Sequence, residues 1–304
     1  MNQEEIEILI KAGELGFKAH KYAQKIIKPG VDLNKIGLKI DQFVIDNNAF
    51  PAWPVNLSVN NEAAHNSYDL ENERILKEDD VLKVDIGVSI DGYISDSAQT
   101  IIFNKKNEPL KQASVDALGA AKKYLSENYK TAIISEVSDI IYKKIKEFGF
   151  NPVSNLTGHY ITRYTPHASP SIPNVPNTIP YKFSDFEEHF AIEPFVSTGD
   201  GVISEGAQIL IFEHEEDRPV RNKAAKEILD EIKQFNGMPF SEYWVGKNMD
   251  PFTRKYALRE LLRLEIISGF PVLIGKKDTL ISQTETSFLI TKEGLPDLVK
   301  IDEL

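Results

Sequence analysis

Two aspartates, Asp85 and Asp96, flank an Asp91-Gly92 pair that lies between two runs of alternating apolar residues. An Asp-Gly pair in this setting predicts a tight β-hairpin. With a two-residue loop, Asp85 lies opposite Ala98, and Asp96 lies two positions from Ala98 and so on the same face. The two carboxylates then become diagonal neighbours roughly 7 Å apart at Cα, within reach of a shared divalent cation.

The hairpin alone leaves a simpler interpretation open. Two aspartates on one hairpin face are more often its solvated side. The opposite face of the first strand carries Leu82, Val84, Ile86, Val88 and Ile90, as in an ordinary half-buried strand. The choice therefore depends on whether further ligands exist elsewhere in the chain.

Other acid and imidazole groups occur at informative places. His159 lies in or beside a short strand, Glu193 ends an apolar strand before a proline, and Glu285 lies inside another β-like run. His65 and His167 lie on turn-rich segments. Burying a carboxylate is costly unless it is paired or bound to a cation. Each residue also has an ordinary interpretation: a structural histidine for His159, an exposed strand face for Glu285, and exposed loop histidines for the other two.

Together these residues offer two aspartates, two glutamates and one imidazole on separate strands, with two further histidines on loops. An oxygen-rich set with one imidazole suits Mn, Fe, Co or Zn rather than a structural zinc site built on cysteine, and the chain has no cysteine. Two ions that share bridging carboxylates can generate hydroxide near neutral pH and clamp a tetrahedral intermediate.

Composition excludes several classes of protein. The chain has 304 residues and a net charge of −11, which disfavours a dedicated nucleic-acid binder. It has no apolar run long enough to span a membrane, and its acidic amphipathic N-terminus is unlike a signal peptide. The absence of cysteine excludes disulfides and a cysteine nucleophile. The length allows one large α/β domain or two smaller ones.

The elements that must position these residues follow from hydrophobic spacing. Helices are expected at about 3–27, 34–48, 108–128 and 135–149, with a short strand near 55–60. Five prolines stiffen the segment 163–181, which is predicted to be a loop that holds side chains still rather than a flexible linker. Residues 218–270 have helical spacing between strand-rich segments and are expected to form an insertion.

The motifs VDIGVSIDGYISD, GHYITRYTPH, FAIEPF and QTE, in this order and spacing, resemble those of methionine aminopeptidases in peptidase family M24. The helical block and the upstream NLSVNNEAAH resemble the type 2 subclass in an archaeal-like form. The resemblance covers nearly the whole chain. It implies an α+β pita-bread fold, in which a pseudo-symmetric antiparallel sheet is backed by helices. It also implies one catalytic domain over 1–304, with a winged-helix-like insertion at 218–270.

The resemblance implies a metal-dependent hydrolase, a methionyl aminopeptidase. Such an enzyme removes the initiator methionine from nascent proteins when the second residue is small. It uses two divalent ions (Co, Mn, Fe or Zn) and a bridging hydroxide as the nucleophile. The implied setting is a cytoplasmic monomer that acts on nascent N-termini, without a membrane or direct nucleic-acid contact; docking on the ribosome stays open.

The family's metal ligands carry over onto Asp85, Asp96, His159, Glu193 and Glu285. By this resemblance Asp85 would chelate one ion. Asp96 and Glu285 would bridge both ions. His159 and Glu193 would complete the second ion.

The resemblance also implies roles beside the metals. His65 and His167 match histidines that hydrogen-bond the scissile peptide and the developing oxyanion, and Glu193 would shuttle the proton to the leaving amine. Trp53 stands where phenylalanine is common and is expected to narrow the methionine side-chain pocket. Thr286 stands where histidine is common, which affects the surroundings of the metals rather than their ligands. The sequence after His65 reads AAHNSY where AAHYTP is usual.

Two alternatives remain. Aminopeptidase P and prolidase share these ligands, but they usually carry an extra N-terminal domain, for which a ligand hairpin starting near residue 80 leaves no room. The second is a non-catalytic homologue that binds the ribosome or nucleic acid. Such homologues typically lose ligands, whereas all five are present here, and the acidic net charge also disfavours that function.

Overall fold

The main sheet has the strand order β1-β4-β5-β15-β9-β7-β8, with β2 paired to β4, in a computed structural model that describes residues 1–185, 189–292 and 294–304. Each strand pair recorded in it is antiparallel. Its strands are β1 Phe50–Pro51, β2 Asn56–Val59, β4 Val81–Ile90, β5 Tyr93–Ile102, β7 Thr157–Thr162, β8 Thr165–Pro173, β9 His189–Ile192 and β15 Glu285–Leu289.

Two smaller sheets flank the main one. The first has the order β14-β10-β6, from Ile281–Gln283, Phe195–Ser197 and Asn151–Pro152. The second has the order β12-β11-β13-β3, from Phe240–Ser241, Ser204–His214, Ile267–Ile274 and Glu62–Ala64. The second sheet supplies the wall that faces the main sheet across the cavity described below.

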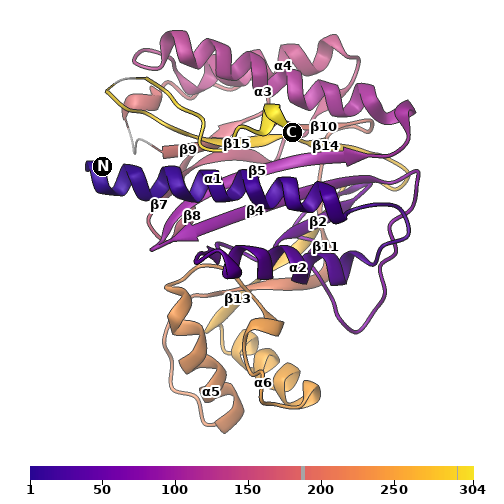
Figure 1. Cartoon of the computed structure of the whole chain (residues 1–304), viewed down its shortest axis with the longest axis vertical. Coiled ribbons are helices and arrows are strands. Elements are labelled where there is room, and N and C mark those ends of the chain that lie inside the picture. The colour runs from indigo at the N-terminus through magenta and orange to yellow at the C-terminus, as the bar shows by residue number, and fades with distance from the viewer. Residues whose placement is uncertain (186–188, 293) are drawn as a thin grey trace.

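Two helix pairs back the sheet (Figure 1), consistent with the predicted α+β pita-bread architecture. The helices are α1 Gln3–Ile26, α2 Leu33–Asp46, α3 Glu108–Asn128, α4 Ile134–Glu147, α5 Lys223–Ile232 and α6 Pro251–Arg263. The four helices expected between residues 3 and 149 are thus confirmed to within two residues at each end. No helix in the described ranges is long and apolar enough to cross a membrane.

Local signals explain where the first two helices begin. Asn2 and Glu5 form a reciprocal capping box at the start of α1, and the Asp32 side chain accepts the Asn34 amide at the start of α2. The buried residues of α1 recur every three or four positions. They form one apolar face, which packs on β4 and β5. This packing supports one face of the hairpin strands β4 and β5, which carry Asp85 and Asp96.

The hairpin has the predicted register. Asp91 and Gly92 both have positive φ, 51° and 83°, as a two-residue type I′ turn requires. Asp85 lies opposite Ala98, so the pairing inferred from the Asp-Gly turn is confirmed.

The proline-rich segment differs from the sequence prediction. It was expected to be a loop, but residues 165–173 form β8, which pairs with β7 at the edge of the main sheet. Proline lacks an N–H and is tolerated on an edge strand, where one side needs no partner. Shifts in the β7–β8 register accompany the prolines. His167 therefore lies on a strand, β8, that pairs with the His159 strand β7, and not on a loop.

Residues 215–266 connect β11 to its antiparallel partner β13. This segment contains α5 and α6, which lie at the opposite end of the molecule from α3 and α4 (Figure 1). Its helices pack on each other through an apolar cluster that includes Ile228, Leu229, Ala257 and Leu261. Phe240–Ser241 returns to pair with β11, which fixes the segment to the second sheet.

Two helical glycines, Gly13 in α1 and Gly119 in α3, give a test of how closely these helices pack on the rest of the chain. A Cβ at Gly13 would lie 2.2 Å from the carbonyl oxygen of Leu298, whereas a Cβ at Gly119 would meet nothing within 4 Å. We expect Gly13→Ala to lower the free energy of unfolding by about 1–3 kcal/mol through steric overlap. Gly119→Ala should raise it by about 1 kcal/mol through helix propensity. Urea denaturation measures both; a gain in stability for Gly13→Ala would contradict the α1 packing.

Candidate metal centre

Strand register brings predicted ligands from three strands to one face of the main sheet. Asn56, Asp85, Ala98 and Glu285 lie directly opposite one another across β2, β4, β5 and β15. Asp96 precedes Ala98 by two residues and so points to the same face. The hairpin thus supplies two acids of this row, and β15 supplies a third from the far end of the sequence.

The other half of the site comes from β15, β9 and β7. Ser287, Ala191 and His159 lie directly opposite one another on these strands. Glu285 lies two residues before Ser287, and Glu193 lies two residues after Ala191. Alternation along a strand places both glutamates on the face of His159. All five acid and imidazole side chains predicted as ligands therefore face one region.

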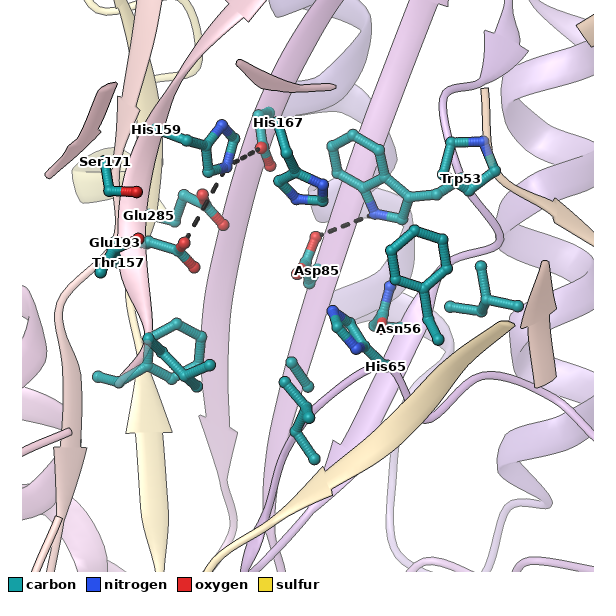
Figure 2. A pocket seen from close by; sticks show the side chains of 18 of the residues that line it. Trp53, Asn56, His65, Asp85, Thr157, His159, His167, Ser171, Glu193 and Glu285 are labelled. Atoms are coloured by element: carbon teal, nitrogen blue, oxygen red, sulfur yellow. Dashed lines mark hydrogen bonds and ion pairs between the residues drawn. The ribbon is translucent and has the colours of Figure 1, made fainter. Parts of the chain in front are cut away.

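These side chains line a cavity of about 330 Å³, shown in Figure 2. Its lining includes every residue singled out from the sequence as a site residue: Trp53, His65, Asp85, Asp96, His159, His167, Glu193 and Glu285. Within the described part of the chain, no lysine or arginine lines it. Phe270 and Leu273 of β13 and Pro239 form part of the opposite wall.

Three of the ligand candidates converge most closely. Asp96, His159 and Glu285 each place a ligand atom within 4.8 Å of the others. His159 Nε2 lies 3.4 Å from Asp96 Oδ2 and 4.0 Å from Glu193 Oε1. Asp85 stands on the other side of the cavity (Figure 2), where its Oδ1 accepts a hydrogen bond of 3.2 Å from Trp53 Nε1.

The His159 ring is held in one orientation. Its Nδ1 lies 3.3 Å from the carbonyl oxygen of Tyr160. A carbonyl can only accept, so Nδ1 carries the proton in this contact. In the neutral ring Nε2 then keeps a free lone pair, and it is Nε2 that faces the carboxylates. A backbone carbonyl that fixes the histidine tautomer in this way is typical of histidine ligands of metals.

The carboxylates lack a counter-charge. Burial raises the pKa of Asp85, Glu193 and Glu285 well above their ordinary values, and the charge of Asp96 adds to the shift in each case. Asp96 Oδ1 is buried and makes no hydrogen bond. A bound divalent cation would both occupy this orphaned oxygen and replace the protons that the acids otherwise retain. The residues present therefore fit a metal site.

The two other histidines flank the carboxylates. The His65 ring donates from Nδ1 to the Pro271 carbonyl oxygen at 3.2 Å, and burial lowers its pKa. The His167 ring meets that of His159 edge-on at 4.6 Å. Burial lowers the His167 pKa well below its ordinary value, and the charges of His159 and His65 lower it further. Both rings are thus neutral near pH 7 and can accept or donate a hydrogen bond.

The structure adds contacts that the sequence analysis missed. Gln283 Nε2 donates to Glu193 Oε2 at 3.3 Å and to Glu285 Oε2 at 3.2 Å. Its spacing of two residues from Glu285 was the available signal. Trp53 lines the cavity as expected, and its hydrogen bond to Asp85 was not foreseen. Thr286 faces away from the metal side, and its hydroxyl donates to the Val299 carbonyl oxygen at 2.6 Å.

Comparison with solved structures supports the fold. The structure of a thermophilic Arx1 has a TM-score of 0.83 at 16% identity, with 98% of this chain and 91% of that chain covered. The methionine aminopeptidase of Rickettsia prowazekii has a TM-score of 0.69 at 17% identity, with 98% of each chain covered. At these identities the likeness shows the shared fold, which is the pita-bread fold.

Comparison of sequences shows the family. The sequence model of metallopeptidase family M24 matches residues 7–214. Methionine aminopeptidase of Thermococcus onnurineus is 39% identical over 292 residues, which cover 96% of this chain and 98% of the relative. That of Methanocaldococcus jannaschii is 35% identical, with 97% and 98% covered. Taken with the buried cluster of acids and imidazole, these matches show that the chain belongs to metallopeptidase family M24 and, within it, to the methionine aminopeptidases.

Proposed function

We propose that this protein is a metal-dependent aminopeptidase that removes the initiator methionine from nascent polypeptides whose second residue is small. One observation carries the proposal: four carboxylates and the His159 imidazole, whose Nε2 faces them, line a single cavity with no lysine or arginine among its described lining residues. In a chain of this family, such a cavity is suited to bind divalent metal and the end of a peptide.

Two ions are proposed, held by the five residues carried over from the family. Asp85 would hold one ion, His159 and Glu193 would hold the other, and Asp96 and Glu285 would serve both. When bound, such ions lower the pKa of coordinated water and polarise a peptide carbonyl. The observed geometry supports this assignment through the close approach of Asp96, His159 and Glu285.

The chain's own residues supply binding and proton transfer. Neutral His65 and His167 are proposed to hydrogen-bond the scissile peptide and the oxyanion that develops on it. Glu193 is proposed to hold the proton on a carboxylate oxygen and pass it to the leaving amine. Trp53 is proposed to bound the methionine side-chain pocket.

A proline-specific activity is the nearest alternative. The prolidase from Pyrococcus furiosus has a TM-score of 0.60 at 18% identity, and this chain covers 64% of it. The full-length relatives at 35–39% identity are named methionine aminopeptidases, which favours methionine removal. The other alternative, a non-catalytic homologue that binds the ribosome or nucleic acid, is disfavoured because an acid cluster with raised pKa values costs stability and has no role without a cation.

The proposal includes organisation and setting. We infer that residues 218–270 are the insertion typical of type 2 enzymes, and that the remaining residues of 1–304 form one catalytic domain. The position of α5 and α6 between the paired strands β11 and β13 supports this division. We also propose that the protein is a cytoplasmic monomer that acts on nascent chains.

The metal assignment predicts that Asp96→Asn is more stable than the wild type without metal and less stabilised than the wild type when metal is added. Without metal, this variant should be more stable than the wild type, because one of several mutually repelling buried charges is gone. With metal at about 100 times its Kd, wild type should gain ~2.7 kcal/mol for one site, and the variant should gain much less. Unfolding by urea with and without chelator, together with metal analysis, measures both effects.

Asp91→Asn is the matched control for that experiment. Asp91 lies at the tip of the same hairpin with φ of 51°, outside the cavity lining, and asparagine tolerates this conformation. It should keep wild-type metal content and the wild-type response to chelator. An Asp96→Asn protein that binds metal as tightly as the Asp91→Asn control would remove Asp96 from the ligand set.

The substrate assignment predicts a preference that peptides can measure. Peptides starting Met-Gly, Met-Ala, Met-Ser, Met-Thr, Met-Val, Met-Pro or Met-Cys should be cleaved, and Met-Lys peptides should not. The edge strand β8 carries His167 into the cavity lining, and we expect it to limit the space beside the scissile bond. Release of methionine from Met-Ala-Ser, compared with hydrolysis of Ala-Pro at equal metal loading, decides between the activities. Faster hydrolysis of Ala-Pro would favour the prolidase alternative.

A further inference from the structure

His65 occupies a strained position. It follows β3 directly and has a φ of 63°, in the left-handed region that non-glycine residues visit rarely. Such a conformation costs free energy and persists only where neighbouring groups enforce it. The contacts of the residues around His65 show which groups do so.

Arg74 holds the two residues that follow His65. Its Nη1 donates to the Asn66 side-chain oxygen at 2.7 Å and to the Ser67 carbonyl oxygen at 2.8 Å. Its Nη2 donates to the Leu57 carbonyl oxygen. The Leu57 amide in turn donates to the Asn66 carbonyl oxygen at 2.7 Å. One planar guanidinium thus joins the His65 turn to strand β2.

Strand β2 pairs with β4, the strand that carries the proposed metal ligand Asp85. Asn56, next to Leu57, lies opposite Asp85 on β4. The backbone of Arg74 is itself fixed, because its amide donates to the Asp32 carboxylate at 3.2 Å and its carbonyl accepts the Leu33 amide at 2.8 Å. Arg74 is therefore anchored at the start of α2 and spans from there to the turn of His65.

A second set of contacts holds Tyr68, the residue that follows the turn at 65–67. The buried Tyr68 hydroxyl donates to Asp41 Oδ2 at 2.7 Å and accepts from Trp244 Nε1 at 2.7 Å. Asp41 Oδ1 also accepts the Val55 amide at 3.2 Å. The turn after His65 is thus fixed on both sides, and Arg74 supplies the contacts with the two residues that directly follow the histidine.

We propose that Arg74 is the positioning residue for His65: its guanidinium fixes the turn at residues 65–67 against β2 and so sets where the His65 imidazole stands relative to Asp85. Arg74 does not line the cavity and acts only through His65. The expected effect of Arg74 on turnover rests on the proposed function, whereas its expected effect on the position of the His65 ring does not.

Lysine cannot replace this group. The guanidinium reaches three oxygen atoms through a rigid fork, whereas an ammonium is a compact charge on a flexible stem. Arg74→Lys should therefore keep the charge and release the turn. Arg218→Lys is the matched control, because Arg218 also donates to a backbone carbonyl, that of Leu264 at 2.9 Å, but its other contacts are with Glu216 and Glu265 rather than with residues 65–67.

The test combines a direct readout of the ring with kinetics. In metal-free protein with ¹³C-labelled histidine, Arg74→Lys should shift the His65 ring signal and leave that of buried His20 in place. In the metal-loaded enzyme, kcat on Met-Ala-Ser should fall by on the order of 10²-fold, as for a misplaced group, with metal content unchanged. In a His65→Ala background, Arg74→Lys should cause no further loss. Arg218→Lys should resemble wild type throughout.

Two results would overturn the proposal: an unshifted His65 signal in Arg74→Lys, or an equal fold-loss of kcat with and without His65. If Arg74→Lys does not fold, Asn66→Ala removes one acceptor of the same guanidinium and should shift the same signal; an unshifted signal there would also overturn it. A fully active His65→Ala enzyme would instead refute the catalytic role given to His65, and the ring signal would still decide whether Arg74 positions it.

Discussion

The mutual repulsion of buried carboxylates is the constraint around which the molecule is organised. Asp85, Asp96, Glu193 and Glu285 share one cavity, and burial followed by the charge of Asp96 raises the pKa values of Asp85, Glu193 and Glu285. Side chains under this repulsion move apart unless their backbones are held. Here each lies on, or directly beside, a strand of the main sheet, so separation would break backbone hydrogen bonds. The sheet therefore maintains a site that favours a cation before any cation arrives.

The sequence predicted the part of this site that is local. The Asp-Gly turn sets a register in which Asp85 and Asp96 share a face, and the structure has that register. The hairpin cannot indicate which strand pairs with its free edge. That Glu285 lies opposite Ala98 depends on packing between distant segments, and only the resemblance to a family linked these residues in advance. An acid inside an apolar strand was the physical signal in each case.

One wrong prediction and one missed contact share a cause, because in both cases a residue was judged by its type rather than by its partner. The prolines of 163–181 predicted a loop, yet an edge strand tolerates proline, and β8 is at an edge. Trp53 was considered only as a pocket wall. Its indole N–H donates to Asp85, and this donor favours the ionised carboxylate that a metal requires. Neither the edge position nor the Asp85 contact can be read without the tertiary arrangement.

The cavity is formed where two sheets meet, and this explains why one turn matters so much to it. The acids stand on the main sheet, whereas Phe270 and Leu273 stand on β13 of the second sheet. His65 stands on the side of the second sheet: it follows β3, which pairs with β13, and its ring donates to the Pro271 carbonyl oxygen of β13. The turn after it is tied to β2 of the main sheet through Leu57. A shift at His65 therefore changes the spacing between the acids and the opposite wall. The left-handed backbone of His65 therefore lies where the two walls of the cavity are joined.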